Sequence, residues 1–459
     1  MPSSGVAKRN FETAASPIGL LIFVVTLIVS PARGAGYGLK EHSVDAMAAV
    51  YAGAAATQTD ASYLAYNPAS LASVIDADFS VSAVQIFAGS RANYTLATTS
   101  AGSSTGGSGK PSDFINNATV PAFGLRQRIS EHWAVGLSIT APWGLRTNYP
   151  SNWAGRYYAQ KSSLLTINAT PIVSYQLSPG LAFGAGLQIE YAQGTLTSAI
   201  DTGTLGVLNA IPGAIPGSQD SFARVTGKSW TVGYTAGVID RIGNVSLGIS
   251  YRSSLQHDLR GPLTFKLDDA GIGATIRGLS GLFTDTRQVT PLIMPDVIES
   301  GARVDFSDYW SGMLELDWTH WSRFRELRVV ADNPAQTDDV TTTRWKNAFF
   351  ASAGAEYRAS PFWTIRAGIG YDQSPTRDAT REPRIPDADR IWLSAGFRYR
   401  MSDSFDVSVA ASRLFNLKQE VTLDPGIPGA ALRGTLAGTT HSYVDVAGLQ
   451  VSFRPDQND

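Results

Sequence analysis

Cysteine is absent from the 459 residues of this sequence. That absence excludes disulfide bonds, thiol nucleophiles and metal sites built on cysteine. An excess of either charge is also missing, because 37 basic residues stand against 39 acidic ones. A nucleic-acid-binding surface would need a basic excess, so no nucleic-acid partner is expected.

Long apolar runs are scarce. The run from Ile18 to Val29 spans 12 residues, follows Lys8 and Arg9, and is closed by Pro31. A basic start, a short apolar stretch and small residues around Arg33 are typical of a secretory signal peptide, which we place at residues 1–34. Beyond it no stretch approaches the roughly 20 apolar residues of a membrane-spanning helix.

Recognisable catalytic motifs are lacking as well. The sequence has neither the His-Glu-x-x-His motif of zinc proteases nor a phosphate-binding loop, and its histidines are not spaced as metal ligands. Glu315 and Asp317 could form an acid–base pair, but a solvated or ion-paired role among many charges is the stronger interpretation. We therefore predict no enzymatic activity, no catalytic residue, no metal and no cofactor. The histidines are His42, His132, His257, His320 and His441.

What the sequence does contain is a repeated two-residue period. From Trp133 to Thr140 every odd position is large and apolar and every even one is small or polar. Strands alternate faces, so each such segment has one apolar and one polar face. Behind a secretory signal, roughly 12–16 such segments predict an all-β fold, a closed transmembrane antiparallel barrel. A secreted soluble β-protein is the alternative. The period recurs in Leu181 to Ala192, Ser229 to Val238, Ser246 to Arg252, Trp310 to Trp318, Trp363 to Asp372 and Ile391 to Arg400.

The two faces of these segments differ in chemistry. Aromatic residues at segment ends match the interfacial belts of membrane barrels, although in a soluble sandwich they would be core residues. The opposite face carries charges of both signs, which suit a wet or plugged lumen and would be costly in a dry core. These inward charges are predicted at Glu190, Arg252, Glu315, Asp317, Glu356, Arg358, Arg366, Asp372, Arg398 and Arg400.

The segment before the strands has a different composition. Asp45 to Gly53 is rich in alanine, which favours short helices, and Asn67-Pro68-Ala69 has a capping residue followed by proline, a helix start. We predict a partly helical plug at 35–75, a barrel with long loops on one side at 76–453, and a tail at 454–459. Phe453 closes the last strand, so the tail leaves open whether it serves as the assembly signal.

Several motifs, in order along nearly the whole mature chain, resemble the outer-membrane long-chain fatty acid transporters and their aromatic-hydrocarbon relatives. They are Ala35 to Glu41, Tyr51-Ala52-Gly53, Asn67-Pro68-Ala69, Pro142 to Leu145, Gly155 to Ala159, Ser246 to Ser253, Met294-Pro295-Asp296, Asp317 to Ser322, Arg366-Ala367-Gly368, Tyr371 to Pro375 and Ile385 to Trp392.

The resemblance implies a barrel of about fourteen strands with an N-terminal hatch, in the outer membrane of a Gram-negative bacterium. It implies passive uptake of hydrophobic molecules by a monomer: capture at the extracellular loops, transfer to an internal pocket, hatch rearrangement and lateral release. Expected partners are fatty acids or hydrocarbons, outer-membrane lipid and lipopolysaccharide, and the barrel assembly machinery. Two functions from other classes stay open, an outer-membrane lipid hydrolase and a structural or adhesive barrel.

Specific residues follow from the same resemblance. Pro142, Trp143 and Gly144 match a kinked strand beside a lateral opening; alternatively, Pro142 only ends a strand at the rim. Asn67, Pro68 and Ala69 match the hatch motif, which carries the gating role. Lys346 matches a lysine facing the internal pocket, and its alternative is an ordinary lysine paired with an acid.

Two further positions bear on the ligand. Gln193 stands where the best-known members carry a second basic residue, which leaves room for a neutral hydrocarbon. The connection from Leu205 to Pro216 is apolar, and exposed apolar patches usually mark binding. We expect Leu208, Ile211 and Ile215 of this connection, with Val207, to contribute to a capture groove; the alternative is that they pack against other loops.

Overall fold

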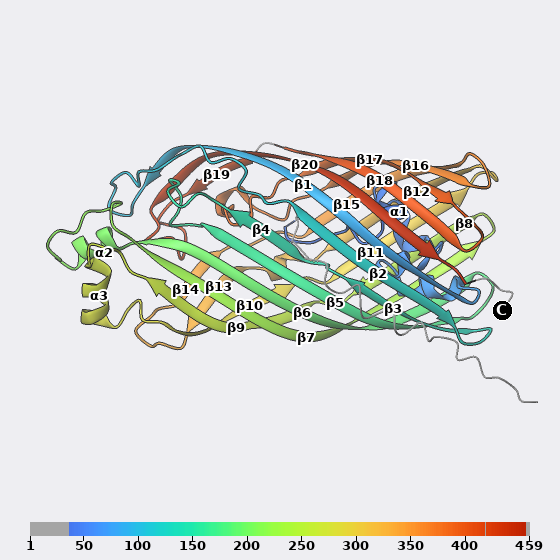
Figure 1. Ribbon diagram of the computed structural model, residues 1–459, viewed down its shortest axis with the longest axis horizontal. Coiled ribbons are helices and arrows are strands. Elements are labelled where there is room, and N and C mark those ends of the chain that lie inside the picture. The colour runs from blue at the N-terminus through green and yellow to red at the C-terminus, as the bar shows by residue number, and fades with distance from the viewer. Residues whose placement is uncertain (1–35, 418, 456–459) are drawn as a thin grey trace, which may run out of the picture.

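The computed structural model describes residues 36–417 and 419–455, and the predicted signal peptide lies outside them. The wall is one antiparallel sheet that closes on itself as a barrel of 14 strands (Figure 1). The last strand, β20 (Thr435–Phe453), pairs with the first, β1 (Ala77–Thr98), from Phe79↔Phe453 to Thr98↔Thr435. The predicted all-β transmembrane barrel is confirmed, and the pairing of its first and last strands closes the wall.

The other continuous wall strands are β2 (Ala118–Arg128), β5 (Lys161–Gln176), β6 (Leu181–Asp201), β7 (Asp220–Ile242), β12 (Trp310–Thr319), β15 (Ala348–Arg358), β16 (Trp363–Asp372) and β17 (Arg390–Arg400). Four wall strands are each built of two segments. These are β3 (Trp133–Thr140) with β4 (Gly144–Asn148), β8 (Val245–Arg252) with β9 (Leu255–Lys266), β11 (Val297–Asp305) with β10 (Thr286–Met294), and β18 (Phe405–Asn416) with β19 (Gln419–Leu423).

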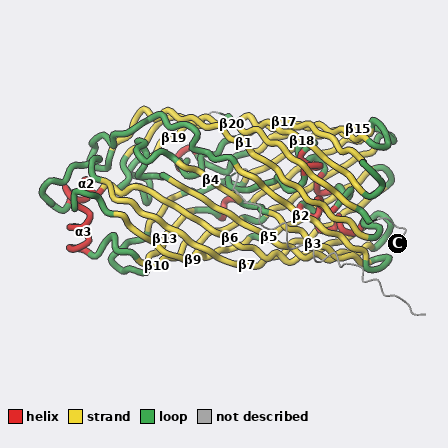
Figure 2. Tube along the Cα trace, viewed as in Figure 1, coloured by secondary structure: helices red, strands yellow, loops and turns green. Residues whose placement is uncertain are grey.

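The two ends of the barrel differ (Figure 2). Tight turns join the strands at the end where the chain terminates, and long loops join them at the other. The long loops carry α2 (Thr202–Leu208), α3 (Ile272–Ser280), the short helices η5 (Trp321–Arg323) and η6 (Asp378–Thr380), and a hairpin of β13 (Glu326–Ala331) and β14 (Asp339–Thr342). The connection between β6 and β7 spans only residues 202–219, because the two strands stay paired up to Asp201↔Asp220.

The two faces of the wall follow the period of the sequence. Large apolar side chains such as Leu187, Trp230 and Tyr234 are exposed on the outside. Most of the inward charges are buried; Arg252 is half-buried, and Arg358 and Arg400 are more exposed because they lie beside the short turns. Within the described residues no helix is long and apolar enough to cross a membrane.

The hatch fills the lumen toward the short-turn end (Figure 1). It contains α1 (Val44–Met47) and the short helices η2 (Ala54–Ala56), η3 (Ala61–Ala65) and η4 (Pro68–Ser73). Asn67 caps η4 through its side-chain oxygen, as the sequence predicts, and its amide also donates to Ala55 O at 2.7 Å.

Two kinds of contact fix the body of the hatch to the wall. Asp45 accepts from Arg398 Nη2 at 2.6 Å and is ion-paired with Arg366; Asp60 is also ion-paired with Arg398. Glycines in the wall admit the hatch backbone: a Cβ at Gly248 would lie 2.0 Å from Ala55 O. Removing one partner from such a buried ion pair is strongly destabilising, so this part of the hatch is firmly held.

Candidate functional site

The wall ladder is interrupted between β2 and the β3–β4 strand. On the short-turn side the pairing ends at Phe123↔Ile139, and on the loop side it resumes in the same register at Ile115↔Thr147. Between these two points the described residues of the two strands form no ladder. β2 still pairs with β1 along Ala118 to Ala122, so only its other edge lacks a partner.

Proline stands on both sides of this interruption. Pro142 separates β3 from β4, and Pro121 lies in the stretch of β2 that faces it. A proline cannot donate to a ladder, so paired strands would lose hydrogen bonds at both positions. The sequence analysis identified Pro142 but not Pro121, although a proline inside an alternating strand is itself a signal of an unpaired edge.

The first described residues of the hatch, Gly36 to His42, form what we call the hatch limb. Leu39 N donates to Pro142 O and Gly144 N donates to Tyr37 O, both at 2.8 Å. Gly38 and Trp143 form the bridge between these bonds. The limb therefore supplies, from inside, the backbone partners that β2 does not give.

An aromatic cluster surrounds Tyr37 of the limb. Its ring centroid lies 4.7 Å from that of Trp321, 5.6 Å from Phe324, 5.7 Å from Trp345 and 6.0 Å from Trp143. All five side chains are buried, and Tyr37 Oη donates to Ile293 O at 2.8 Å. The cluster thus joins the limb, the wall interruption and two loop segments.

On the loop side of this cluster lies an apolar space, the upper cavity, of about 60 Å³. Tyr37 and Phe324 form its floor, and Leu164, Leu259 and Leu292 are among its walls. Ser163, Gln288 and Thr290 contribute its polar side chains, and none of its described lining residues is charged. It is smaller than the roughly 300 Å³ of typical ligand pockets, so a long ligand would have to enlarge it.

A larger groove of about 340 Å³, the loop groove, lies among the long loops. It shares Leu196, Val225 and Leu327 with the upper cavity, so the two spaces adjoin. Its lining is more apolar than polar, and its charged residues are Asp201, Asp338, Asp339, Arg384 and Arg433. Arg433 is ion-paired with Asp339 and Glu382. Burial and the nearby Arg433 lower the pKa of Arg384, and the carboxylates of Glu382 and Asp339 oppose this effect.

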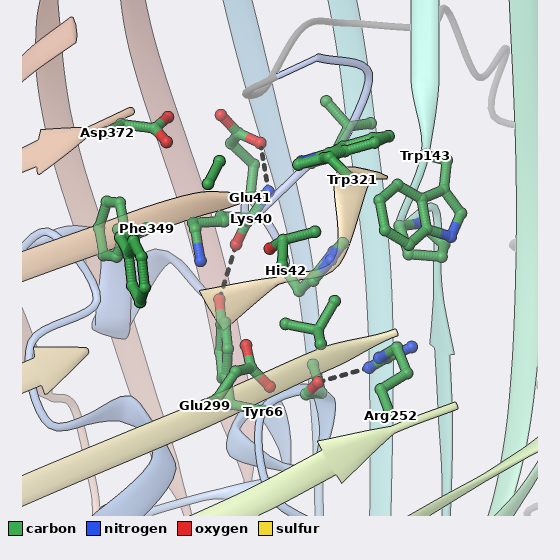
Figure 3. Close-up of a pocket in the computed structure, with 18 of the residues that line it drawn as sticks. Lys40, Glu41, His42, Tyr66, Trp143, Arg252, Glu299, Trp321, Phe349 and Asp372 are labelled. Atoms are coloured by element: carbon green, nitrogen blue, oxygen red, sulfur yellow. Dashed lines mark hydrogen bonds between the residues drawn. The ribbon is translucent and has the colours of Figure 1, made fainter. Parts of the chain in front are cut away.

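Below the cluster, the hatch cavity is lined by both polar and aromatic groups (Figure 3). Lys40, Glu41 and His42 come from the hatch limb, and Glu299, Arg252 and Asp372 come from the wall. Lys40 is ion-paired with Asp317 and lies 4.3 Å from the ring centroid of Phe350. Pro142 and Trp143 also line this cavity, so it extends to the wall interruption.

The neighbouring side chains of Glu41 and His42 have strongly shifted pKa values, and they change the stability of the packed limb with pH in opposite directions. Burial raises the pKa of the Glu41 carboxyl to about 7, with Asp372 adding to the effect and Arg390 opposing it. Burial also lowers the pKa of His42 to about 3, together with the charges of Arg252 and Lys40. Glu41 therefore weakens the packed limb as pH rises from 4.5 to 7, whereas His42 weakens it as pH falls from 6.5 to 3.

We expect hydrogen-exchange protection of residues 36–43 to change little between pH 4.5 and 6.5, because the two contributions oppose each other there. Glu41→Gln should convert this plateau into protection that rises with pH, by up to about tenfold per pH unit. His42→Gln should produce the opposite slope. Equal pH profiles for the wild type and both variants would contradict this assignment.

The other predicted site residues are placed as follows. Lys346 is half-buried, and its backbone N–H donates to Pro375 O, but it is not among the residues that line the described cavities. Gln193 is exposed on the outer face beside Tyr191, whose hydroxyl donates to it, while its neighbour Ala192 faces inward. The structure thus gives Gln193 no contact with either interior cavity.

The side chains of the apolar connection from Leu205 to Pro216 divide into an exposed set and a packed set. Leu208 and Ile215 are more than half exposed, and Val207 nearly so. Ile211 packs with Leu205 against Ile276 of α3, and Leu205 lines the loop groove.

Asn67, Pro68 and Ala69 of the hatch lie against the wall, where a Cβ at Gly184 would be 2.3 Å from Pro68 C.

Comparison with known proteins places these features in context. Residues 25–454 match the model of a family described as outer membrane protein transport protein (OMPP1/FadL/TodX). The long-chain fatty acid transport protein of Escherichia coli O6:H1 is 28% identical over 444 residues, covering 92% of this chain and 97% of that one. Outer membrane protein P1 of Haemophilus influenzae is 25% identical, covering 95% and 98%.

Solved structures agree in fold. A Pseudomonas aeruginosa FadL homologue superposes with a TM-score of 0.82 at 24% identity, covering 91% of this chain and 99% of that one. The Pseudomonas putida toluene transporter TodX superposes with a TM-score of 0.66 at 17% identity, covering 92% and 100%. Both similarities show the barrel fold alone.

Proposed function

Because the chain belongs to the OMPP1/FadL/TodX family of outer-membrane transporters of hydrophobic compounds, we propose that it takes up long-chain fatty acids passively and releases them sideways through the wall. The observation that supports this most is the series of adjoining spaces. The loop groove shares lining residues with the upper cavity, the aromatic cluster separates the upper cavity from the hatch cavity, and the hatch cavity ends at Pro142 and Trp143.

Capture begins in the loop groove. The long-loop end is extracellular in barrels of this kind, and the groove is within the size range of ligand pockets. Leu205 lines it directly, and the exposed Leu208 and Ile215 extend an apolar surface next to it. Each methylene removed from water contributes about 0.8 kcal/mol, so an acyl chain is held there without any energy source.

Transfer needs the hatch limb to move. The upper cavity is too small for an acyl chain while Tyr37 forms its floor. The limb is held by two backbone bonds to the wall, the aromatic cluster, the Lys40–Asp317 ion pair and the bond from Gly36 N to Asp387 at 2.9 Å, whereas several buried ion pairs fix the body of the hatch. We therefore assign the gating movement to Gly36–His42, with the Asn67-Pro68-Ala69 segment as its fixed support.

Release follows from the same movement. Withdrawal of Tyr37 and Leu39 frees the backbone of Pro142 and Gly144, and β2 offers no ladder partner to replace them. An apolar chain can then leave between the two strands into the membrane. This route keeps the chain out of water, which would otherwise cost the burial energy gained at capture.

The carboxylate is expected to interact with cations along the way. Arg384 beside the loop groove is the first, and Lys346, next to the aromatic cluster through Trp345, is the second. A neutral hydrocarbon is the second candidate substrate, and the uncharged lining of the upper cavity favours it.

The test is uptake of labelled oleate and of labelled hexadecane by Gram-negative cells that lack their own transporter. Saturable oleate uptake above the empty-vector control supports fatty acid transport. Uptake of hexadecane alone, with the barrel shown to be assembled by its heat-dependent gel mobility, would favour the neutral substrate.

In the same assay, Lys346→Ala should lower oleate uptake about twofold to fivefold, the range of a partly exposed ion pair, and leave hexadecane uptake unchanged. Lys110→Ala, which removes an exposed lysine from a loop, is the matched control. Equal effects of Lys346→Ala on both compounds would remove the proposed role of this lysine.

A further inference from the structure

Basic residues gather on the outer face of the wall near its extracellular end. Arg224 and Lys228 of β7, Arg260 and Lys266 of β9, and Arg287 of β10 are all exposed, and we call them the basic patch. Their sequence neighbours on these strands face the lumen, as Leu259 and Gln288 do. The patch is therefore directed at whatever surrounds the barrel and takes no part in the route through it.

The patch brings like charges together. Lys228 lies directly opposite Arg260 across β7 and β9, an arrangement that is destabilising unless an anion lies between the charges. Arg260 has one described carboxylate partner, Asp258, at 3.6 Å, and both side chains are about half exposed. Arg287 of β10 lies opposite Pro262 of β9 and is therefore diagonal to Arg260. Among the described residues no ion pair is found for Arg224, Lys228, Lys266 or Arg287.

Aromatic residues fix the depth of the patch in the membrane. Tyr191 and Trp230 lie opposite each other directly below Gln193 and Lys228, with ring centroids 5.1 Å apart. Trp230 is 70% exposed, and exposed Val232 and Tyr234 continue the apolar surface below it. Such aromatics lie at the membrane interface. Lys228 is two residues further along the strand, about 5 Å higher at a strand tilt of about 40°, and is therefore at the level of the lipid headgroups.

The surface at this level is also concave. Tyr191, Trp230 and Gln256 line a depression in the outer face together with Lys228, Asp258 and Arg260. Its side chains include two aromatic rings, the two cations above them and the carboxylate of Asp258, which lies 3.6 Å from Arg260. That combination fits a ligand whose phosphate lies directly above an apolar body.

The opposite side of the barrel lacks this excess. There, Arg413 of β18 is ion-paired with Asp445 of β20 at 3.5 Å, and Glu420 of β19 faces outward near them. Among the described residues of β1, β18, β19 and β20, Arg91 is the other exposed cation, and it lies opposite His441. On the outer face of the described wall strands, the unpaired basic charge therefore gathers on β7, β9 and β10 and not on the opposite side.

We propose that the basic patch binds lipopolysaccharide of the outer leaflet, with a lipid A phosphate between Lys228 and Arg260 and the adjoining glucosamine and acyl carbons against Tyr191 and Trp230. The phosphate relieves the repulsion between the opposed cations, and these cations take the place of the divalent ions that otherwise bridge the phosphates of neighbouring lipids. Arg224, Lys266 and Arg287 extend the site toward further phosphates. This site orients the barrel in its leaflet and is independent of the proposed transport route.

The experiment measures binding of diphosphoryl lipid A to the purified, detergent-solubilised barrel by native mass spectrometry. Lys228→Gln/Arg260→Gln is compared with Arg91→Gln/Arg413→Gln, which makes the same charge change on the opposite face. Heat-dependent gel mobility verifies that each barrel is assembled. Arg224→Gln/Lys266→Gln is the second patch variant, should the first fail to assemble.

We expect the patch variants to bind diphosphoryl lipid A at least about tenfold more weakly than the wild type, since each cation near an anionic lipid surface adds to the free energy of binding. The opposite-face variant should bind like the wild type, and oleate uptake should be unchanged in all of them. Dephosphorylated lipid A and phosphatidylglycerol should bind weakly to every protein. Undiminished binding by the patch variants, or equal binding of dephosphorylated lipid A or phosphatidylglycerol, would overturn the proposal.

Discussion

Replacing Pro121, Pro142 and Gly144 together by valine is expected to lower oleate uptake at least about tenfold in correctly assembled barrels. The substitutions restore backbone donors at both prolines and β propensity at all three positions. The register is already continuous on both sides of the interruption, so β2 can pair with β3–β4 without a shift. Several new ladder bonds, each worth about 0.5–1.5 kcal/mol net, would hold the wall closed.

The matched control is Pro295→Val. Pro295 separates β10 from β11, but β10 pairs with β9 up to Met294↔Leu255 and β11 resumes pairing with β8 at Val297↔Arg252. Its replacement should leave uptake near the wild-type rate. Normal uptake in the triple variant, with the barrel assembled, would contradict lateral release.

The second large effect is expected from Tyr37→Ala. Tyr37 is the centre of the aromatic cluster, and removing a buried aromatic side chain costs about 3–5 kcal/mol. That loss would shift the hatch limb toward its displaced state by two or more orders of magnitude. We expect faster entry of the hydrophobic dye N-phenyl-1-naphthylamine into intact cells and loss of saturation in oleate uptake.

Tyr37→Phe is the control for this prediction. It keeps the ring contacts and loses only the hydroxyl that donates to Ile293 O. Dye entry should therefore stay near the wild-type rate. Equal dye entry in the alanine and phenylalanine variants would show that the ring does not close the route.

The sequence predicts the wall well because its signal is local. Alternation assigns inward and outward residues strand by strand, and the Asn67-Pro68 helix start is encoded within three residues. The orientation of Gln193 depends on register, since a shift by one residue exchanges the two faces. The structure places Ala192 inside and Gln193 outside.

Features built from distant segments are harder to predict. The aromatic cluster joins Tyr37 to Trp143 and to Trp321, Phe324 and Trp345, and no periodicity connects these positions. The wall interruption requires Pro121 and Pro142 to face each other, which only strand register reveals. The basic patch likewise forms only when β7, β9 and β10 lie side by side.

The central claim is that the hatch limb closes the lateral route and must move for transport. Gly38 and Trp143 form a bridge flanked by two backbone hydrogen bonds, the arrangement that brings Cα atoms to about 4.5 Å and suits a disulfide. Because the chain has no other cysteine, Gly38→Cys/Trp143→Cys would form a single disulfide that tethers the limb to the wall. Oleate uptake measured before and after reduction is the decisive comparison. We predict uptake near the empty-vector level in the oxidised protein and its recovery on reduction; equal uptake in both states, with the disulfide verified, would contradict the account.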